Sequence, residues 1–285
     1  MQQRGIELHA LLPANPLRRR LARLDLRNHR KLAVIDGKIA HTGSQNIVDP
    51  AYGRRGMVWH DIMVRLTGPV VLQLQQVFEE DWYSVTSELF DQTTCFPTPA
   101  VTGDVAIQTV PHGPTYQAES FQALIIAAIQ EAREHVIISS PYLVPDEPFM
   151  VALKLAVLRG VEVDVIVPRR SDHPLVSAAG RAYFDDLLDA GVHIHRHDQG
   201  LLHAKTVTVD DAFAIISSAN VDIRSFYLNF ELSLLLYGPS ITSQLRFIQR
   251  QYIDQSQPLD HNAWAQRPRS HQVFDNIAKL LSPLL

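Results

Sequence analysis

The chain has 285 residues, 46% of them hydrophobic and 20% charged, a composition and length typical of a globular protein of about two domains with separate cores. Its formal net charge of -4 gives no global attraction for nucleic acid or anionic lipid, so partners must be inferred from a local site. A single cysteine, Cys95, excludes an intrachain disulfide and a cysteine-based zinc site.

In the first part of the chain, apolar alternation predicts strands at residues 5–11 and 31–35. Asp36-Gly37 is a strong hairpin signal that leads into a second strand through Ile39. The segment DIMVRLTGP predicts another short strand, and apolar residues at helical spacing predict a helix from Pro69 to about Tyr83. These elements form the first predicted lobe.

The best candidate linker is the turn-rich, nonperiodic segment SELFDQTTCFPTPAVTGD. We place the boundary near residue 100, which gives a first lobe of residues 1–100 and a second lobe of residues 101–285. No apolar run in the printed sequence approaches the length of a membrane span, and MQQRGIELHALLP lacks the regions of a signal peptide. We therefore expect the chain to be soluble or peripheral to a membrane.

The second part of the chain alternates strands with helices, which indicates an α/β fold. A hairpin after its last predicted strand makes the expected sheet mixed rather than wholly parallel. The predicted strands are 104–110, 136–140, 162–168 and 192–196, and the predicted helices are 120–134, 148–159 and about 175–190.

One pattern occurs twice. His29-x-Lys31 is followed by Asp36, and His203-x-Lys205 is followed by Asp210, with the same spacing. A small-residue turn with Ser-x-Asn follows each copy, at Ser44 and Asn46 and at Ser218 and Asn220. The interval between the two histidines is much too long for the period of a solenoid, so the repeated unit is a domain.

The two copies sit differently within their lobes. His203 lies about 100 residues after the start of its lobe, whereas His29 lies 28 residues after Met1. If both lobes share one fold, the first is expected to lack the βαβα structure that precedes the motif in the second. The predicted fold is therefore two similar α/β lobes with mixed sheets flanked by helices, related by a pseudo-twofold axis, with the first lobe incomplete and the site at their interface.

The residue types suit phosphodiester chemistry. Residues i and i+2 of a strand point to one side, so each histidine projects with its lysine, and two such pairs face to face form an anion site with nucleophiles. One histidine can attack phosphorus while the other acts as general acid. The lysines, with hydrogen bonds from the serines and asparagines, can neutralise the phosphate oxygens, so no metal is required. The predicted phosphate-binding residues are Ser44, Asn46, Ser218 and Asn220.

A nucleophilic imidazole also needs an acceptor on its far nitrogen. Asp61 and Glu231 fit, because they lie in short apolar strands at similar intervals after His29 and His203. The motif aspartates, Asp36 and Asp210, are counted with the catalytic residues, although their place in hairpin turns favours a structural role. The alternating histidines of HIHRH (193–197) could suggest a metal, but without a nearby cysteine a surface face is the favoured interpretation, and no metal or cofactor is expected.

These motifs resemble the phospholipase D superfamily. The duplicated HxKxxxxD, the GSQN and SSAN turns, the segment SSPYLVPDEP and especially SSANVDIRSFYLNFEL resemble the bacterial cardiolipin synthases within it. The resemblance implies a phosphohistidine intermediate on His29, with His203 protonating the departing alcohol. It also implies transfer of a phosphatidyl group from a phosphatidylglycerol-like lipid to the alcohol of another. The N-terminal membrane segments and the front of the first lobe, which the family has, are expected to be absent.

Two rival functions remain open at this point. One is phospholipase D-type hydrolysis of lipid or nucleic acid, and the other is a noncatalytic remnant that binds phosphate or lipid. The expected partners are a phospholipid substrate and a membrane surface, with no nucleic acid, and the sequence leaves the oligomeric state open. The expected location is peripheral on a bacterial cell membrane, and otherwise the cytoplasm.

Overall fold

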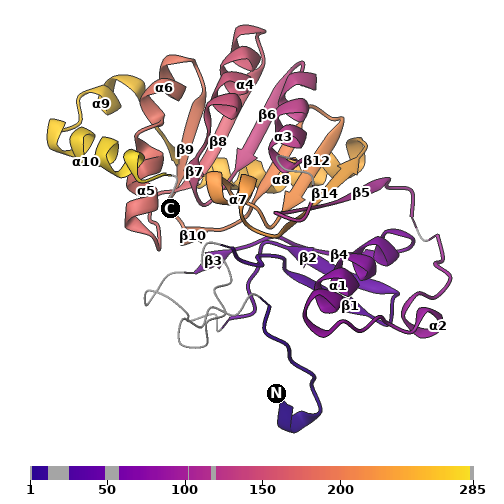
Figure 1. Ribbon diagram of the computed structural model, residues 1–285. Coiled ribbons are helices and arrows are strands. Elements are labelled where there is room, and N and C mark those ends of the chain that lie inside the picture. Colours follow the sequence, from indigo (N-terminus) through magenta and orange to yellow (C-terminus); the bar gives the residue numbers. More distant parts are fainter. Residues whose placement is uncertain (1, 12–25, 49–57, 102, 117–119, 283–285) are drawn as a thin grey trace, which may run out of the picture.

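Two sheets of unequal size organise the protein (Figure 1). The computed structural model describes residues 2–11, 26–48, 58–101, 103–116 and 120–282. The smaller sheet and its helix lie below the larger sheet in Figure 1, and the N-terminal segment extends away from them.

The smaller sheet is antiparallel, with the strand order β1-β2-β4, and helix α1 packs against all three strands. Asp36, Gly37 and Lys38 connect β1 to β2, and Asp36 and Gly37 have φ angles of 53° and 62°, in the left-handed region. A side chain at Gly37 would collide with the backbone of Cys95, so only glycine fits there. The bounds are β1 (Leu32–Ile35), β2 (Ile39–Gly43), β4 (Met63–Thr67) and α1 (Val70–Thr86).

The larger sheet has eight strands in the order β15-β9-β8-β6-β11-β12-β14-β5. The pairs β6-β8 and β8-β9 are parallel and the other neighbours are antiparallel, so the sheet is mixed as predicted. Its strands are β5 (Ile107–His112), β6 (His135–Ser139), β8 (Glu162–Pro168), β9 (His193–His197), β11 (Thr206–Val209), β12 (Phe213–Ser217), β14 (Glu231–Tyr237) and β15 (Ser256–Pro258).

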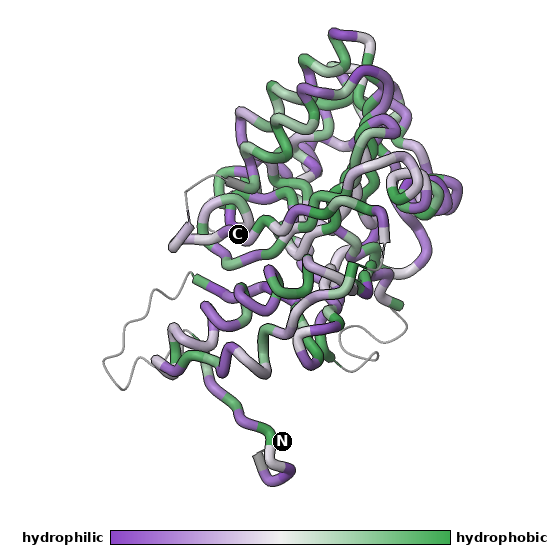
Figure 2. Tube along the Cα trace, turned by 90° about the vertical axis from the view of Figure 1, so that its right-hand side faces the viewer, coloured by the Kyte–Doolittle hydropathy of each residue, from purple (hydrophilic) through white to green (hydrophobic). Residues whose placement is uncertain are grey.

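Helices cover both faces of this sheet. Successive strand residues point to opposite faces, and Val136 and Ile138 accordingly join one core cluster with α3 and α4, whereas Ile137 joins another with α8. The second cluster also holds Leu66 and Leu74 of the smaller lobe, so the two lobes share it. Figure 2 shows the largely hydrophobic strands inside and the alternating hydropathy of the outer helices. The covering helices are α3 (Ser120–Glu131), α4 (Glu147–Leu158) and α8 (Pro239–Asp254).

Shorter elements complete the described chain. Helix α10 packs on α5, and α9 packs on α6. The parallel pairs β3-β10 and β7-β13 are two residues long. The bounds are η1 (Gln2–Arg4), β3 (Trp59–His60), α2 (Gln92–Cys95), β7 (Leu143–Val144), α5 (Pro174–Arg181), α6 (Phe184–Asp189), β10 (Leu201–Leu202), β13 (Val221–Asp222), α7 (Ile223–Tyr227), α9 (His261–Ala265) and α10 (Arg269–Leu280).

The two lobes repeat one substructure. In the smaller lobe β1, β2, β4 and α1 follow one another, and in the larger lobe β11, β12, β14 and α8 follow in the same order. The hairpin registers agree as well, because Leu32 pairs with Thr42 and Thr206 pairs with Ile216, each offset by the same interval that separates the two motif histidines. The duplicated motif thus belongs to a duplicated three-stranded sheet and helix.

Two predicted elements are wrong. Residues 5–11 form no strand, because the exposed apolar side chains of Ile6 and Leu8 have no neighbouring strand in the described chain. The helix predicted at 175–190 is divided into α5 and α6, whose halves pack on different partners. The other predicted strands and helices are present within a few residues of their expected bounds. No helix among the described residues combines the length and apolar character needed to span a membrane.

Candidate active site

The lobes meet at two equivalent backbone contacts that carry the motif histidines. The amide of His29 donates to the carbonyl of Phe230 at 2.8 Å, and the amide of His203 donates to the carbonyl of His60 at 2.8 Å. The acceptor in each case directly precedes an acidic residue of the opposite lobe, Glu231 or Asp61. The backbone therefore sets each histidine beside a carboxylate that the other lobe supplies.

The histidines and carboxylates pair across the interface. Nδ1 of His29 lies 3.0 Å from Oε1 of Glu231, and Nδ1 of His203 lies 2.6 Å from Oδ1 of Asp61. The sequence spacing associates each carboxylate with the histidine of its own lobe, and the structure corrects that pairing. Nδ1 is engaged in both rings, which leaves each Nε2 for chemistry on a substrate.

Two serines hold the carboxylates. Ser44 Oγ donates to Oδ1 of Asp61 at 2.7 Å, and Ser218 Oγ donates to Oε2 of Glu231 at 2.6 Å. A hydroxyl has one hydrogen to donate, so neither serine has a proton left for a phosphate oxygen. In this arrangement both serines position the acids, and binding of phosphate by Ser44 and Ser218 stays a prediction. The same two hydroxyls each accept a backbone N–H, from Ile62 and Leu232, at 2.9 Å.

The asparagines differ from each other. Asn220 is buried, its Nδ2 donates to Asp222 at 3.0 Å, and its Oδ1 has no hydrogen-bond partner among the described residues. Asn46 is half-buried in the segment after β2. A third asparagine, Asn229, reaches Oε1 of Glu231 with its Nδ2 at 3.3 Å. Phosphate binding by Asn46 and Asn220 stays a prediction.

The two lysines share a geometry and differ in burial. Nζ of Lys31 donates to the carbonyl of His29 at 2.6 Å, and Nζ of Lys205 donates to that of His203 at 2.7 Å. Burial, followed by the charge of Lys31, lowers the pKa of Lys205 to about 7. Burial also lowers the pKa of Lys31, against the charges of Glu231 and Asp61. Each ammonium thus responds to groups of both lobes, which makes the site one electrostatic unit.

The pKa values of His203 and of the two carboxylates are all lowered, but for different reasons. Burial, followed by the charge of Lys205, lowers the pKa of His203 to about 4, although Asp61 counteracts the shift. Burial alone would raise the pKa of Asp61 and Glu231, but hydrogen bonds and charges from their histidines hold both below their usual values. The resting site therefore holds two carboxylates and a neutral His203 at neutral pH.

The motif aspartates are far from this chemistry. Asp210 accepts hydrogen bonds from the backbone amides of Arg133, Glu134 and His135 at 2.8 to 2.9 Å, and Asp36 is an exposed residue of the β1-β2 turn. Strand β1 lies between His29 and Asp36, and strand β11 lies between His203 and Asp210. Their place among the catalytic residues is corrected to a structural one. Burial and the three backbone hydrogen bonds oppose each other at Asp210, and its pKa is lowered.

Two residues that the sequence analysis did not single out also shape the site. The ring of Trp59 meets that of His203 edge to face, with centroids 4.9 Å apart. The side chain of Arg30 donates to the carbonyl of Glu231 at 3.1 Å and to Asp81 at 2.6 Å, which ties that carboxylate's backbone to helix α1. Trp59 directly precedes His60-Asp61, and Arg30 lies between the motif histidine and lysine, so adjacency to the motif was the available signal.

Comparisons with known proteins find similar chains. Residues 125–251 match the family described as "Cardiolipin synthase, PLD-like domain". The whole chain aligns with cardiolipin synthase A of Serratia proteamaculans at 38% identity and with that of Yersinia pseudotuberculosis at 37%. It covers 60% of each of these relatives, and so spans about three fifths of their length.

A solved structure shares the fold. Phosphatidylserine synthase from Haemophilus influenzae superposes with a TM-score of 0.67 at 16% identity, over 91% of this chain and 71% of that one. The predicted fold class is confirmed, and so is the predicted resemblance to the phospholipase D superfamily and its cardiolipin synthases.

Proposed function

We propose that this chain, a relative of the cardiolipin synthases of the phospholipase D superfamily, carries the catalytic centre of a phosphatidyltransferase that makes cardiolipin-type lipids. The observation that carries the proposal is the pair of crossed dyads, in which each motif histidine has its Nδ1 on a carboxylate of the other lobe. Two lysines beside these dyads supply the positive charge that a phosphodiester needs.

The first half of the reaction uses one dyad as nucleophile and the other as acid. The lone pair on Nε2 of His29 attacks phosphorus of the donor lipid, and a phosphorus–nitrogen bond forms. The phosphorus–oxygen bond to the leaving glycerol breaks, and the proton on Nε2 of His203 passes to the departing oxygen. Glu231 stabilises the positive charge on His29, and the lysines stabilise the charge on the nonbridging oxygens.

The second half reverses these roles. His203, now neutral, accepts the proton from the hydroxyl of a second lipid, whose oxygen attacks phosphorus and breaks the bond to His29. The products are a cardiolipin-type lipid and free glycerol, with both histidines restored. Every charge that develops has a protein group of opposite charge beside it, so the proposal needs no metal.

Substrate binding supplies the proton that the acid requires. His203 has a pKa of about 4 in the free protein, because burial and Lys205 disfavour its charged form. A phosphodiester anion between the two lysines reverses that balance, since an adjacent negative charge favours the imidazolium. We therefore expect donor binding to be coupled to proton uptake by the site.

Exposure supports the assignment of the two roles. The side chain of His29 is 36% exposed, whereas that of His203 is 7% exposed and lies against Trp59. A nucleophile must reach phosphorus itself, while the acid has only to reach the leaving oxygen. The more open ring, His29, suits attack.

Helix α10 supports the proposed membrane surface. Val273, Phe274, Ile277 and Leu280 form an exposed apolar stripe, whereas Asp275 and Ala278 on the opposite face are buried. The one acidic residue of α10, Asp275, is paired with Arg181 at 2.6 Å, and Arg269 lies beside the stripe. An apolar stripe with a cationic flank is typical of a helix that lies in the plane of a lipid surface.

The test of the function is a transfer assay. Vesicles of labelled phosphatidylglycerol are incubated with the protein in the presence of EDTA, and lipids and water-soluble products are resolved. The expected result is labelled cardiolipin and stoichiometric glycerol. Phosphatidic acid as the only product would indicate hydrolysis, and binding without any product would indicate a noncatalytic protein.

The same vesicles test the lipid surface. Phe274→Ser with Leu280→Ser should weaken sedimentation with the vesicles, while Val151→Ser, which removes an exposed apolar side chain from α4, should not. Equal sedimentation of both variants would remove α10 from the proposal.

A further inference from the structure

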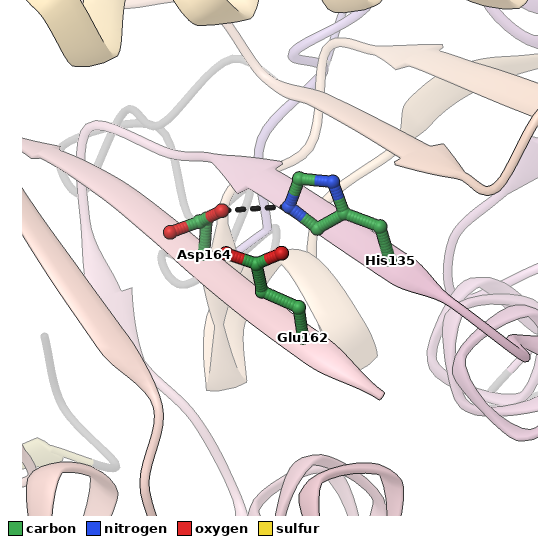
Figure 3. Close-up of side chains that lie close together, drawn as sticks. All are labelled: His135, Glu162 and Asp164. Carbon is green, nitrogen blue, oxygen red and sulfur yellow. Dashed lines mark hydrogen bonds and ion pairs between the residues drawn. The ribbon is translucent and has the colours of Figure 1, made fainter. Parts of the chain in front are cut away.

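A second cluster of ionisable side chains lies at the opposite end of the large sheet. His135 opens β6, Glu162 and Asp164 lie at the start of β8, and His193 and His195 lie in β9. Sheet pairing matches His135 with Glu162 and Asp164 with His193, so these side chains share one face. Figure 3 shows His135, Glu162 and Asp164 pointing toward one another.

Asp164 is the centre of this cluster. Its Oδ2 lies 2.6 Å from Nε2 of His135, and its Oδ1 lies 2.6 Å from Nε2 of His195 and 3.4 Å from Nδ1 of His193. Ligand atoms of His135, Glu162 and Asp164 all lie within 4.8 Å of one another. Three imidazoles and two carboxylates thus converge from three adjacent strands.

The side chains of the cluster differ in exposure, so one side of it is buried and the other faces solvent. The side chains of Asp164 and His195 are 8% and 13% exposed, whereas those of Glu162 and His193 are more than half exposed. An ion can therefore enter from solvent on the side of Glu162 and His193. Two carboxylates with neutral imidazoles carry a charge of -2, which a divalent cation balances.

We propose that His135, Glu162 and Asp164, with His195 or His193 of β9 as the fourth ligand, form a binding site for one Zn²⁺ ion. Imidazole nitrogen and carboxylate oxygen are ligands that zinc takes in tetrahedral sites, at about 2.0 to 2.2 Å. Ligand atoms around such an ion are about 3.3 Å apart, so the contact of 2.6 Å between His135 and Asp164 would open by less than 1 Å. The sequence pattern HIHRH supplies the fourth ligand, while His135, Glu162 and Asp164 become neighbours only through the sheet.

The ion would join strands rather than take part in transfer. The cluster lies beside Asp210, whose Oδ1 accepts the backbone N–H of His135, and strand β11 separates Asp210 from His203. It would link β6, β8 and β9 at the edge where their parallel pairing begins. Binding to the folded state alone raises stability, and this effect is separate from phosphatidyl transfer.

Zinc binding by the untagged protein tests the proposal. The protein is stripped with EDTA, desalted, and titrated with ZnCl₂ by calorimetry, and its melting temperature is measured with and without zinc. The expected result is one ion per chain and a higher melting temperature with zinc. His135→Gln should weaken binding at least tenfold and abolish the zinc-dependent rise in melting temperature.

Two further variants separate ligation from folding. Glu162→Gln changes an exposed side chain, so it should fold normally and still bind zinc more weakly. The matched control is His261→Gln, which alters an exposed histidine paired with Asp189 at 2.8 Å, and it should bind like the parent protein. Absence of saturable binding, or unchanged affinity in His135→Gln and Glu162→Gln, would overturn the site. Transfer by the zinc-free protein below its melting temperature is an independent measurement, so failure of either proposal is distinguishable.

Discussion

The two copies of the motif have the same hydrogen bonds and different surroundings. In each, the histidine contacts a carboxylate of the other lobe, a serine holds that carboxylate, and the lysine bonds its own histidine's carbonyl. Yet His29 is far more exposed than His203, and Lys205 is more buried than Lys31. Duplication therefore supplies two equivalent dyads, and burial makes one accessible and the other enclosed.

The difference in exposure suits the division of roles that we propose for the two histidines. An accessible dyad with a fully buried carboxylate partner, Glu231, is suited to nucleophilic attack. In the enclosed dyad beside Trp59, burial and the charge of Lys205 lower the pKa of His203, so in our proposal this ring takes up its proton when an anion binds. Each substitution described below is expected to affect the two half-reactions unequally.

The largest effects are expected from the histidines. His29→Ala should lower transfer at least about 10³-fold with any donor, because no intermediate can form. His203→Ala should be equally impaired with phosphatidylglycerol, but should still release one equivalent of nitrophenol from a phosphatidyl nitrophenol donor, whose leaving group needs no acid. Rapid-mixing absorbance measures this burst. A burst in His29→Ala and none in His203→Ala would mean that His203 is the nucleophile and His29 the acid. His261→Ala serves as the control.

The crossed pairing is tested by the carboxylates. Glu231→Gln and Asp61→Asn should each lower transfer by about 10² to 10⁴, since an amide favours the wrong imidazole tautomer. With the nitrophenol donor, Glu231→Gln should slow the burst, because it disturbs His29, while Asp61→Asn should leave it nearly unchanged. The reverse result would mean that each carboxylate serves the histidine of its own lobe. Glu88→Gln, at an exposed position, is the matched control.

Much of this site could be predicted from the sequence, because its parts recur at fixed spacing. The repeat identifies the histidines, the lysines and both carboxylates, since each chemical group is local to a strand or turn. The crossed pairing of histidines and carboxylates could not be predicted, because spacing along the chain does not show which lobe supplies the carboxylate for each histidine. The same limit applies to Ser44 and Ser218, for which the sequence predicts contact with phosphate. A turn sequence does not reveal that its hydroxyl points at a carboxylate.

For the fold as well, some elements could be predicted from the sequence and others could not. Alternation and helical periodicity predict most strands and helices of the large lobe, where each element buries a continuous apolar face. Residues 5–11 have the alternation of a strand, but a strand also needs a neighbour to pair with. The break between α5 and α6 follows from packing on two different helices, α10 and α9, which no local pattern encodes.

The lysines should differ in stability as well as in activity. The pKa of Lys205 is lowered to about 7, so between about pH 7 and 10.5 the unfolded chain binds a proton that the folded state disfavours. Lys205→Met should therefore abolish transfer and raise the free energy of unfolding near pH 8 by about 2 to 4 kcal/mol. Lys31→Met, at the half-buried position, should raise the free energy of unfolding by a smaller amount. Urea denaturation measures both, and a net loss of stability in Lys205→Met would contradict this electrostatic account.

A smaller effect is expected from pH. The folded pKa of His203, about 4, lies below its ordinary value of 6.5, so the unfolded state binds the proton more readily and stability falls as pH drops from about 6.5 to 4. Between pH 7.5 and 5 this group should account for a loss of about 2 kcal/mol. The loss should be absent in His203→Gln. Equal pH dependence of the two proteins would show that His203 titrates normally.

The central claim is that the accessible dyad forms the covalent intermediate. His203→Ala is incubated with the phosphatidyl nitrophenol donor, digested under neutral conditions, and the modified peptide is located by mass spectrometry. The account predicts a phosphatidyl adduct on His29, which accumulates because no base activates the acceptor alcohol. An adduct on another residue, or burst release of nitrophenol without any adduct on the protein, would contradict it.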